Sequence, residues 1–470
     1  KYLLAIPLRL TLIPVLRIFM FDPMILSRIQ FGANITFHIL FPTISIALGW
    51  FLFYFKIQFN RTGDATWNQA YQFWVKIFAL TFALGVVSGI TMSFQFGTNW
   101  PGYMKTIGNI AGPLLAYEVL TAFFLEATFL GVMLFGSKRV SPRIHTLATF
   151  LVAFGTTLSA FWIIVLNSWM QTPQGFEMVD GQARAVDWFA IVFNPSMPYR
   201  LAHMMTAAFI TVAFLLAGIS AYRQLRGSQS IANRSVLKMA ITTAAILMPI
   251  QIVLGDLHGL NTMQHQPAKL AAMEGIWETG SGVPAVLFAI PDQKTQSNLY
   301  EISIPKLASF YLTHHWDGEV KGLKDFPNQI PPVAPVFFAF RIMVGVGVLM
   351  LLVSWLARWQ IYKTQDIKPW MAKVLVGMTF SGWIAVVAGW YVTEIGRQPY
   401  IVTGVLTTAE AATTISGGIV LSSLLMYLFL YISLIIAYIG VVFYLAREGD
   451  RAATASNTYT GNTYASAVKN

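Results

Sequence analysis

The chain has 470 residues, of which 56% are hydrophobic and only 11% are charged, and its formal net charge is +11. Soluble globular proteins carry roughly 25% charged residues, so this composition excludes a soluble enzyme with an ordinary surface. The absence of cysteine excludes disulfides, zinc–thiolate sites and cysteine-ligated iron–sulfur clusters. The positive charge fits loops that face an inner membrane leaflet better than it fits nucleic-acid binding.

Nine apolar blocks approach the roughly 20 residues that a helix needs to cross a bilayer, which predicts an all-α polytopic membrane protein. In chain order they cover 31–55, 74–96, 114–136, 144–169, 200–222, 236–255, 334–357, 371–394 and 420–446. We see no internal repeat, so an inverted-repeat transporter is not the first interpretation. Residues 1–30 are expected to be an N-terminal extension and lead-in. Within them, 1–19 precede a natural start at Met20, with a tenth span as the alternative.

The short loops alternate in basic content, which predicts the orientation. The loops after the first, third, fifth and seventh spans carry Lys56, Arg61, Lys138, Arg139, Arg143, Arg223, Arg226, Arg234, Lys238, Arg358, Lys363, Lys368 and Lys373. The alternate short loops carry only Lys105, Arg184, Arg200 and Arg397. We therefore expect the N-terminus outside a bacterial cytoplasmic membrane, the C-terminus inside, and 447–470 as a disordered cytoplasmic tail.

A long loop, 256–332, lies on the predicted outer side. Its chemistry-bearing residues are Asp256, His258, His265, Lys269, Glu274, Trp277, Glu278, His314 and His315. A loop of this length in a compact membrane protein is usually a binding element or a partner surface.

Ionisable groups inside spans are costly and are by default functional hypotheses. Three carboxyl groups (Glu118, Glu126 and Glu394), Arg341 and the histidines His38 and His203 fall there. Each histidine is either hydrogen-bonded to a neighbouring helix or an axial haem ligand. Because the chain has no C-x-x-C-H motif, such a haem would be bound non-covalently.

Spacing along an ideal helix gives further expectations. Glu118 and Glu126 would be separated by about 12 Å of rise and roughly 80° of rotation, which suits a proton path along neighbouring faces. Glu394 and Arg397, at i and i+3, can pair on one face, and a carboxylate is also a possible iron ligand. Met343 is one of 19 methionines, most of which are packing residues. Arg341 points away from Met343 in an ideal helix, so one cofactor touches both only if it reaches round the helix or the helix is irregular.

The chain resembles subunit I of cytochrome bd-type quinol oxidases over roughly 24–446. The matching segments, in order, are S-R-I-Q-F at 27–31 with His38 after it, F-Q-F-G-T-N-W at 94–100, E-V-L-T-A-F-F-L-E at 118–126, L-N-S-W-M-Q at 166–171, V-L-G-D at 253–256, K-L-A-A-M-E at 269–274, F-R-I-M-V at 340–344 and E-I-G-R-Q-P-Y at 394–400. The G-R-Q-P motif after a membrane glutamate and the F-Q-F-G-T-N-W segment are the most specific of these.

The resemblance implies three haems: haem b558, haem b595 and haem d, or haem b in its place. His203 and Met343 match the axial ligands of the low-spin haem b558. His38 and Glu394 match ligands of the two high-spin haems, and which of the two serves the oxygen-binding haem stays open. Glu118 matches a carboxylate beside that pair, either an iron ligand or the final proton donor.

The remaining site residues follow from the same resemblance. Glu126, Ser159 and Asn167 match the hydrophilic route for protons. Lys269 and Glu274 match the residues of the outer loop that hold the quinol and take its protons. Arg341 and Arg397 would lie against haem propionates, and Trp390 would pack near the haems.

The implied activity is quinol oxidation at the outer loop and reduction of O2 to water. Protons released outside and consumed inside build a gradient without pumping. The family uses a second membrane subunit, subunit II, and in some members a small single-span subunit; a nucleic-acid partner is not expected. Tyr400 stands where the better-known members have Trp, and together with G-W-Y-V-T-E at 389–394 this resembles the cyanide-insensitive branch. The loop also lacks the long insertion that some members carry after Pro305.

Two other classes of function remain at this stage. A polytopic proton-coupled transporter could use Glu118, Glu126 and Glu394 as a relay, but it leaves His203 and Met343 without a role. A non-catalytic membrane scaffold would bind neither haem nor quinol.

Overall fold

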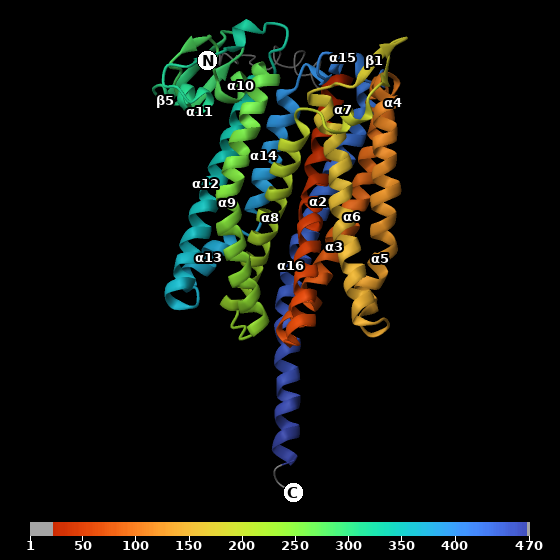
Figure 1. Cartoon of the computed structure of the whole chain (residues 1–470), viewed down its shortest axis with the longest axis vertical. Helices are drawn as coiled ribbons and strands as arrows, with labels where there is room; N and C mark the ends of the chain where they lie inside the picture. Colours follow the sequence, from red (N-terminus) through yellow and green to blue (C-terminus); the bar gives the residue numbers. More distant parts are fainter. Residues whose placement is uncertain (1–21, 468–470) are drawn as a thin grey trace, which may run out of the picture.

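The structure is a computed structural model that describes residues 22–467, without the side chains of residues 138 and 449–467. The predicted extension 1–19 lies outside the described residues. In the described part, nine helical segments are long and apolar enough to cross a membrane. They stand side by side as one bundle (Figure 1), which confirms the all-α, nine-span prediction.

The spans are longer than their apolar blocks. In order they are α2 (Pro23–Thr62), α3 (Ala65–Thr98), the composite α4 (Pro101–Tyr117), η1 (Glu118–Phe123) and α5 (Phe124–Phe135), α6 (Pro142–Gln171), α7 (Trp188–Val192) with α8 (Met197–Leu225), α9 (Ile231–His265), α12 (Val333–Thr364), α13 (Pro369–Gly377) with α14 (Ser381–Gly396), and α16 (Gly417–Ala467).

The start of the first span shows why hydropathy underestimates helix length. Asp22 accepts hydrogen bonds from the backbone N–H of Met24 at 2.8 Å, and of Ile25 at 3.3 Å, and Pro23 occupies the first helical position. An N-cap carboxylate followed by proline is a favoured helix start. The helix therefore begins at Pro23, and residues 23–30 belong to the first span rather than to a lead-in.

The shorter elements gather mostly at one end of the bundle, which we call the loop end, where α10, α15 and β1 lie (Figure 1). Its elements are β1 (Phe176–Val179), β2 (Gln182–Ala185), α10 (Pro267–Glu274), β3 (Gly280–Ser281), β4 (Ala285–Asp292), β5 (Ser297–Ile304), α11 (Leu307–Thr313), β6 (Glu319–Val320), η3 (Leu323–Asp325), β7 (Tyr400–Val402), β8 (Leu406–Thr407) and α15 (Thr408–Ala411). The strands pair antiparallel as β1–β2, β3–β6, β4–β5 and β7–β8. A short turn, η2 (Gly136–Lys138), joins α5 to α6.

Two predicted boundaries differ from the structure. The loop expected from residue 256 starts later, because α9 continues to His265, and the loop holds α10, the β4–β5 hairpin and α11. The tail expected to be disordered from residue 447 is helical as far as Ala467. A helix already nucleated in the membrane needs only propagation to extend, and residues 447–467 contain no proline to stop it.

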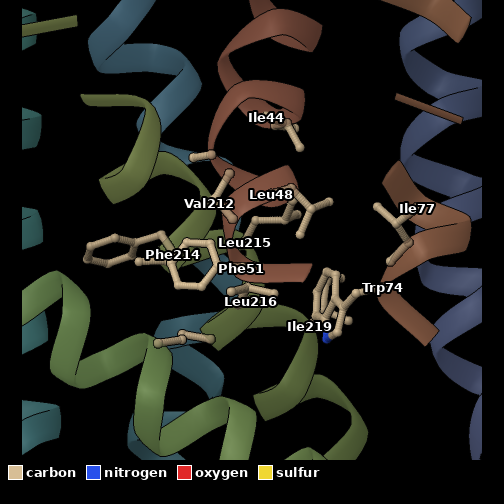
Figure 2. Close-up of a cluster of buried hydrophobic side chains, with 14 of the residues drawn as sticks. Ile44, Leu48, Phe51, Trp74, Ile77, Val212, Phe214, Leu215, Leu216 and Ile219 are labelled. Atoms are coloured by element: carbon tan, nitrogen blue, oxygen red, sulfur yellow. The ribbon is translucent and has the colours of Figure 1, made fainter. Parts of the chain in front are cut away.

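The first span lies at the centre of the bundle. Helix α2 packs against α3, α6, α8, α14 and α16. Figure 2 shows part of its contact with α3 and α8, where Leu48 and Phe51 meet Trp74 and Leu215 in a fully apolar cluster. In lipid, such helices associate mainly by close packing, since the surrounding acyl chains are as apolar as the core.

Glycines let α8 approach its neighbours. A Cβ on Gly218 would lie 2.8 Å from the carbonyl oxygen of Leu375 and 2.9 Å from Cα of Thr379, both on or beside α13. A Cβ on Gly382 of α14 would lie 2.7 Å from Cα of Thr211 on α8. Small residues at a helix crossing allow this backbone-to-backbone approach in membranes.

We predict that Gly218→Ala destabilises the protein, because the added methyl group meets backbone atoms that cannot rotate away. The expected cost is about 1–3 kcal/mol, visible as a lower thermal transition of the purified complex. Gly440→Ala on α16 is the control, since a Cβ there meets nothing within 4 Å. Equal transition temperatures for the two variants would contradict the crossing described here.

Candidate functional site

A cavity of about 550 Å³ lies among α8, α9, α10, α12 and α14, and we call it the His203 cavity. His203 on α8 and Met343 on α12 both line it. A Cβ on Gly255 of α9 would lie 3.3 Å from Cε1 of His203, and one on Gly389 of α14 would lie 3.0 Å from Sδ of Met343. Each of the two donor side chains therefore packs against a glycine of a neighbouring helix, where a larger residue would crowd it.

These residues fit a haem with both axial positions closed. Nδ1 of His203 is buried, and the backbone of Leu254 on α9 hydrogen-bonds the ring, so Nε2 is the nitrogen available to a metal. A neutral imidazole and a thioether are the donor pair of low-spin, electron-transferring haems.

The His203 cavity also reaches the loop end, where Lys269, Glu274 and Tyr311 line it. Nζ of Lys269 donates to Oε1 of Gln171 at 2.5 Å and to Oε1 of Gln266 at 2.7 Å. Burial holds the pKa of Lys269 well below its usual range, and the nearby arginines push it in the same direction.

Glu274 is the buried acid of this group. Burial raises the pKa of its carboxyl group, and a hydrogen bond from Tyr311 and the charge of Arg341 oppose that rise. The helix that carries Glu274 ends at Gly275, with φ +75°. A Cβ there would lie 2.7 Å from the ring of Phe337, so both the conformation and the contact call for glycine.

Arg341, expected beside a haem propionate, lines neither the His203 cavity nor the Glu394 cavity described below. Its guanidinium donates to the backbone carbonyl oxygens of Met273 at 2.6 Å and Phe337 at 3.1 Å, and also to those of Glu274 and Val286. The residue therefore ties α12 to the C-terminal end of α10 and to β4. Because it points away from Met343, the two residues act at different places, as an ideal helix predicts.

A second cavity, of about 790 Å³, adjoins the first, and we call it the Glu394 cavity. Nδ2 of Asn167 donates to Oε1 of Glu394 at 2.9 Å, and Arg397 pairs with the other carboxylate oxygen, which confirms the predicted i, i+3 pair. Arg200 donates to Oδ1 of Asn167 at 2.7 Å. Trp390 lines both cavities, so the two meet at this residue.

The Glu394 cavity also fits a haem. Nε and Nη1 of Arg397 are buried without a hydrogen-bond partner among the described residues. Nε of Arg200, which lines the His203 cavity, is buried in the same way. Buried guanidinium donors without a partner are costly, and an anionic group such as a propionate would satisfy them. The carboxylate of Glu394 would be the donor to a metal.

The structure brings Ser159 and Glu118 together but not Asn167 and Glu126. Oγ of Ser159 donates to Oε1 of Glu118 at 2.7 Å. Glu126 is buried against Gly155 of α6, where a Cβ would lie 2.7 Å from its Cγ. Asn167, expected in the same hydrophilic route, lines the Glu394 cavity, and its place in that route stays a prediction.

The two carboxyl groups both face α6, which corrects the expected 80° rotation between them. The cause is η1, a π-helical turn over Glu118–Phe123. Its i→i+5 hydrogen bonds hold more residues per turn than an α-helix, so eight residues rotate the chain less than the ideal spacing implies. Wide turns of this kind occur often at functional sites.

His38 is seated against α3. Its Nδ1 lies 2.9 Å from Oγ of Ser88, and a Cβ on Gly89 would lie 3.3 Å from its Cε1. This contact orients the ring and leaves Nε2 as the nitrogen available to a metal. His38 lines neither of the two cavities.

Three residues of the site were not singled out from the sequence. Arg200 was counted only as a loop charge, although it precedes His203 by three residues and so shares its helical face. Arg28 donates to Oε1 of Gln398 and lines the Glu394 cavity. Tyr311 carries no local signal, because its partner Glu274 is distant in sequence.

Taken together, the fold and the site define a polytopic membrane protein whose cavities carry the donors of non-covalently bound haem. Residues 26–450 match the family described as cytochrome bd terminal oxidase subunit I.

The relatives agree with this match. Cytochrome bd ubiquinol oxidase subunit 1 of Bacillus subtilis is 35% identical, over 87% of this chain and 91% of the relative. Cytochrome bd-II ubiquinol oxidase subunit 1 of Escherichia coli is 34% identical, over 92% and 98%. The bd oxidase structure from Geobacillus thermodenitrificans superposes with a TM-score of 0.84 at 34% identity, over 91% of this chain and 99% of that one.

The chain belongs to the cytochrome bd terminal oxidase subunit I family. The resemblance drawn from the sequence is confirmed at this level, and with it haem as the class of cofactor and a multi-pass membrane location. The transporter alternative has no support.

Proposed function

We propose that this chain is the haem-binding catalytic subunit of a quinol:O2 oxidoreductase. One observation carries the proposal: the His203 cavity joins the axial donors His203 and Met343 to the acid–base pair Lys269 and Glu274. Trp390 then connects this cavity to the one that holds Glu394. In this arrangement, quinol loses its protons beside Lys269 and Glu274, and its electrons move towards the cavity that holds Glu394.

We assign the haems as the family implies. His203 and Met343 hold haem b558. Glu394 and His38 hold haem b595 and the oxygen-site haem, which is haem d or haem b. When bound, the haems carry single electrons and supply the iron at which O2 is reduced. Arg397 and Arg200 would neutralise the propionates, because both have buried guanidinium N–H donors without a partner among the described residues.

At the loop end, Lys269 and Glu274 bind the quinol. Glu274 accepts a proton from the quinol hydroxyl as a general base, and its raised pKa brings it nearer to the working pH. Lys269, held by Gln171 and Gln266, donates a hydrogen bond to the quinol oxygen. Arg341 keeps the Glu274 backbone in place through its carbonyl oxygen.

Protons for water come from the opposite membrane side. Glu126 passes them to Glu118, whose carboxyl group Ser159 orients by its hydrogen bond. Because η1 brings both carboxyl groups to the α6 side, the relay runs along one helix interface. Proton release at the loop end and uptake from the other end build a gradient without pumping.

The proposed setting is a bacterial cytoplasmic membrane with the loop end outside. The basic short loops at the opposite end support this orientation. The partners are subunit II and, where present, a small single-span subunit. Tyr400 supports placement in the cyanide-insensitive branch, and pigment extraction would decide between haem d and haem b.

We predict that His203→Ala and Met343→Leu each abolish the low-spin absorption band, because either change opens an axial position. The measurement is a reduced-minus-oxidised spectrum of the purified complex. Met350→Leu on the same helix is the control and retains the band. A normal low-spin band in both variants would remove this pair from the haem site.

Glu274 must be ionised to accept a proton, so activity is expected to fall as the pH drops through its raised pKa. The Tyr311 hydroxyl stabilises the ionised form and lowers that pKa. Tyr311→Phe is therefore expected to move the acidic limb of kcat/KM for quinol to higher pH. Glu274→Ala should cost roughly 10²–10⁴-fold in turnover, with haem content retained. A limb that stays in place or moves to lower pH contradicts the assignment.

Gly155→Ala tests the proton relay. The added methyl group displaces Glu126, since it would lie 2.7 Å from its Cγ. Oxygen uptake is expected to fall severalfold while the haem spectrum stays unchanged. Gly131→Ala on α5 is the matched control, because a Cβ there meets nothing within 4 Å. If the two variants turn over equally, Glu126 is not on the proton route.

A further inference from the structure

The β4–β5 hairpin exposes an unusual apolar surface. Its exposed side chains include Leu287, Phe288, Ile290, Leu299, Tyr300 and Ile302, and Tyr300 is 79% exposed. We call this set the hairpin patch. Phe288 pairs with Ile302 and Ile290 with Leu299 across the two strands, so apolar residues lie side by side on the hairpin. A contiguous apolar patch on a solvent-facing loop marks an interaction surface.

The hairpin lies against a membrane-spanning helix. The ring centroids of Phe288 and Phe338 are 6.4 Å apart, and Val286 and Ala289 pack with Phe337. Phe338 is the sixth residue of α12, which places this contact about 8 Å along the helix from its start. In Figure 1, β5 lies at the loop end, on the side of α12 that faces away from the rest of the bundle.

The patch continues the outward face of that helix. From Phe338, residues at i+4, i+11 and i+14 are Ile342, Leu349 and Leu352, which share one helical face. They are 49%, 47% and 52% exposed, as expected for a lipid-facing stripe in a span. The hairpin patch therefore meets the stripe at its loop end.

The hairpin is bonded to the loop that carries Glu274. On β5, Asn298 donates to the carbonyl oxygen of Gly275 at 2.9 Å and accepts from Nε1 of Trp277 at 2.8 Å. On β4, the carbonyl oxygen of Val286 accepts from Arg341, which also donates to the Glu274 carbonyl at 3.3 Å. Any shift of the hairpin therefore displaces the backbone on both sides of Glu274.

We propose that the hairpin patch seats in the membrane interface at the loop end, and that phospholipid covers it at the boundary between headgroups and acyl chains. Aromatic and aliphatic side chains with a phenol hydroxyl among them favour this zone. The seating holds the Glu274 loop at the depth from which a lipid-soluble quinol arrives. That consequence rests on the proposed function, whereas the lipid contact does not.

The absence of cysteine from the chain makes the contact directly measurable. Tyr300→Cys is labelled with an environment-sensitive nitrobenzoxadiazole fluorophore in the complete complex, in phosphatidylcholine nanodiscs. The control is Glu177→Cys on the β1–β2 hairpin, which projects beyond the bundle (Figure 1). The wild-type complex, treated in the same way, gives the background from partner chains.

We expect lipids with a doxyl group at acyl carbon 5 to quench the label at residue 300 at least about twofold more than the label at 177. Aqueous iodide should show the reverse order. Equal iodide quenching at both sites overturns the proposal. So does protection from both quenchers at residue 300, which would mean that a protein partner covers the patch.

A second variant tests the consequence for quinol. Leu299→Lys with Ile302→Lys places two charges in the patch, and Leu299→Ile with Ile302→Leu is the matched control. The charged variant, with Tyr300→Cys labelled, should lose the doxyl quenching and raise KM for quinol severalfold, with the haem spectrum unchanged. Lost quenching with an unchanged KM refutes the positioning role. Retained quenching refutes the claim that the apolar side chains of the patch seat the hairpin in the membrane interface. A wild-type complex that oxidises no quinol refutes the proposed function while the quenching result still stands.

Discussion

The centre of this molecule depends on satisfying the carboxyl group of Glu394 inside an apolar bundle. Burying a polar or charged group in such an interior costs several kcal/mol unless hydrogen bonds or an opposite charge compensate it. Here Asn167 and Arg397 each bond one oxygen of Glu394, and Arg200 holds the amide of Asn167 in turn. The network draws on α6, α8 and α14, so the spans that enclose the two cavities are positioned by the same hydrogen bonds that orient Glu394.

Departures from regular helix geometry place the other donors. The π-helical turn η1 brings Glu118 and Glu126 to the α6 side, where an unbroken α-helix would separate them. Glycines opposite His38, His203 and Met343 give each of these side chains room against a neighbouring helix. A close-packed bundle has few voids, so space for a cofactor must be provided by missing side chains and widened turns. The regular apolar core in Figure 2 packs the helices together, whereas these local exceptions leave the space that a cofactor needs.

The features that the sequence predicts correctly are those that leave a local pattern in it. Nine spans follow from length and hydropathy alone, and the Glu394–Arg397 pair follows from a three-residue spacing. Glu394, the hydrogen-bond partner of Asn167, lies 227 residues away, so no local pattern could have predicted this contact. The π-helical turn at E-V-L-T-A-F also has no local sequence signal, because those residues suit an ordinary α-helix. The helix beyond residue 447 was missed because polar composition was given more weight than propagation from an existing span.

Helix α12 connects the two ends of the proposed electron-transfer step. Arg341 on one side holds the carbonyl oxygens of Met273 and of Glu274, the proposed quinol base, while Met343, two residues on, faces the His203 cavity. Because two residues span only about 3 Å of helix, these positions move together. The position of Glu274 relative to Met343 is therefore set within one helical turn, rather than by the long loop that follows α9. The rest of that loop can then change without moving Glu274, provided that the carbonyl oxygens of Met273 and Glu274 still meet Arg341.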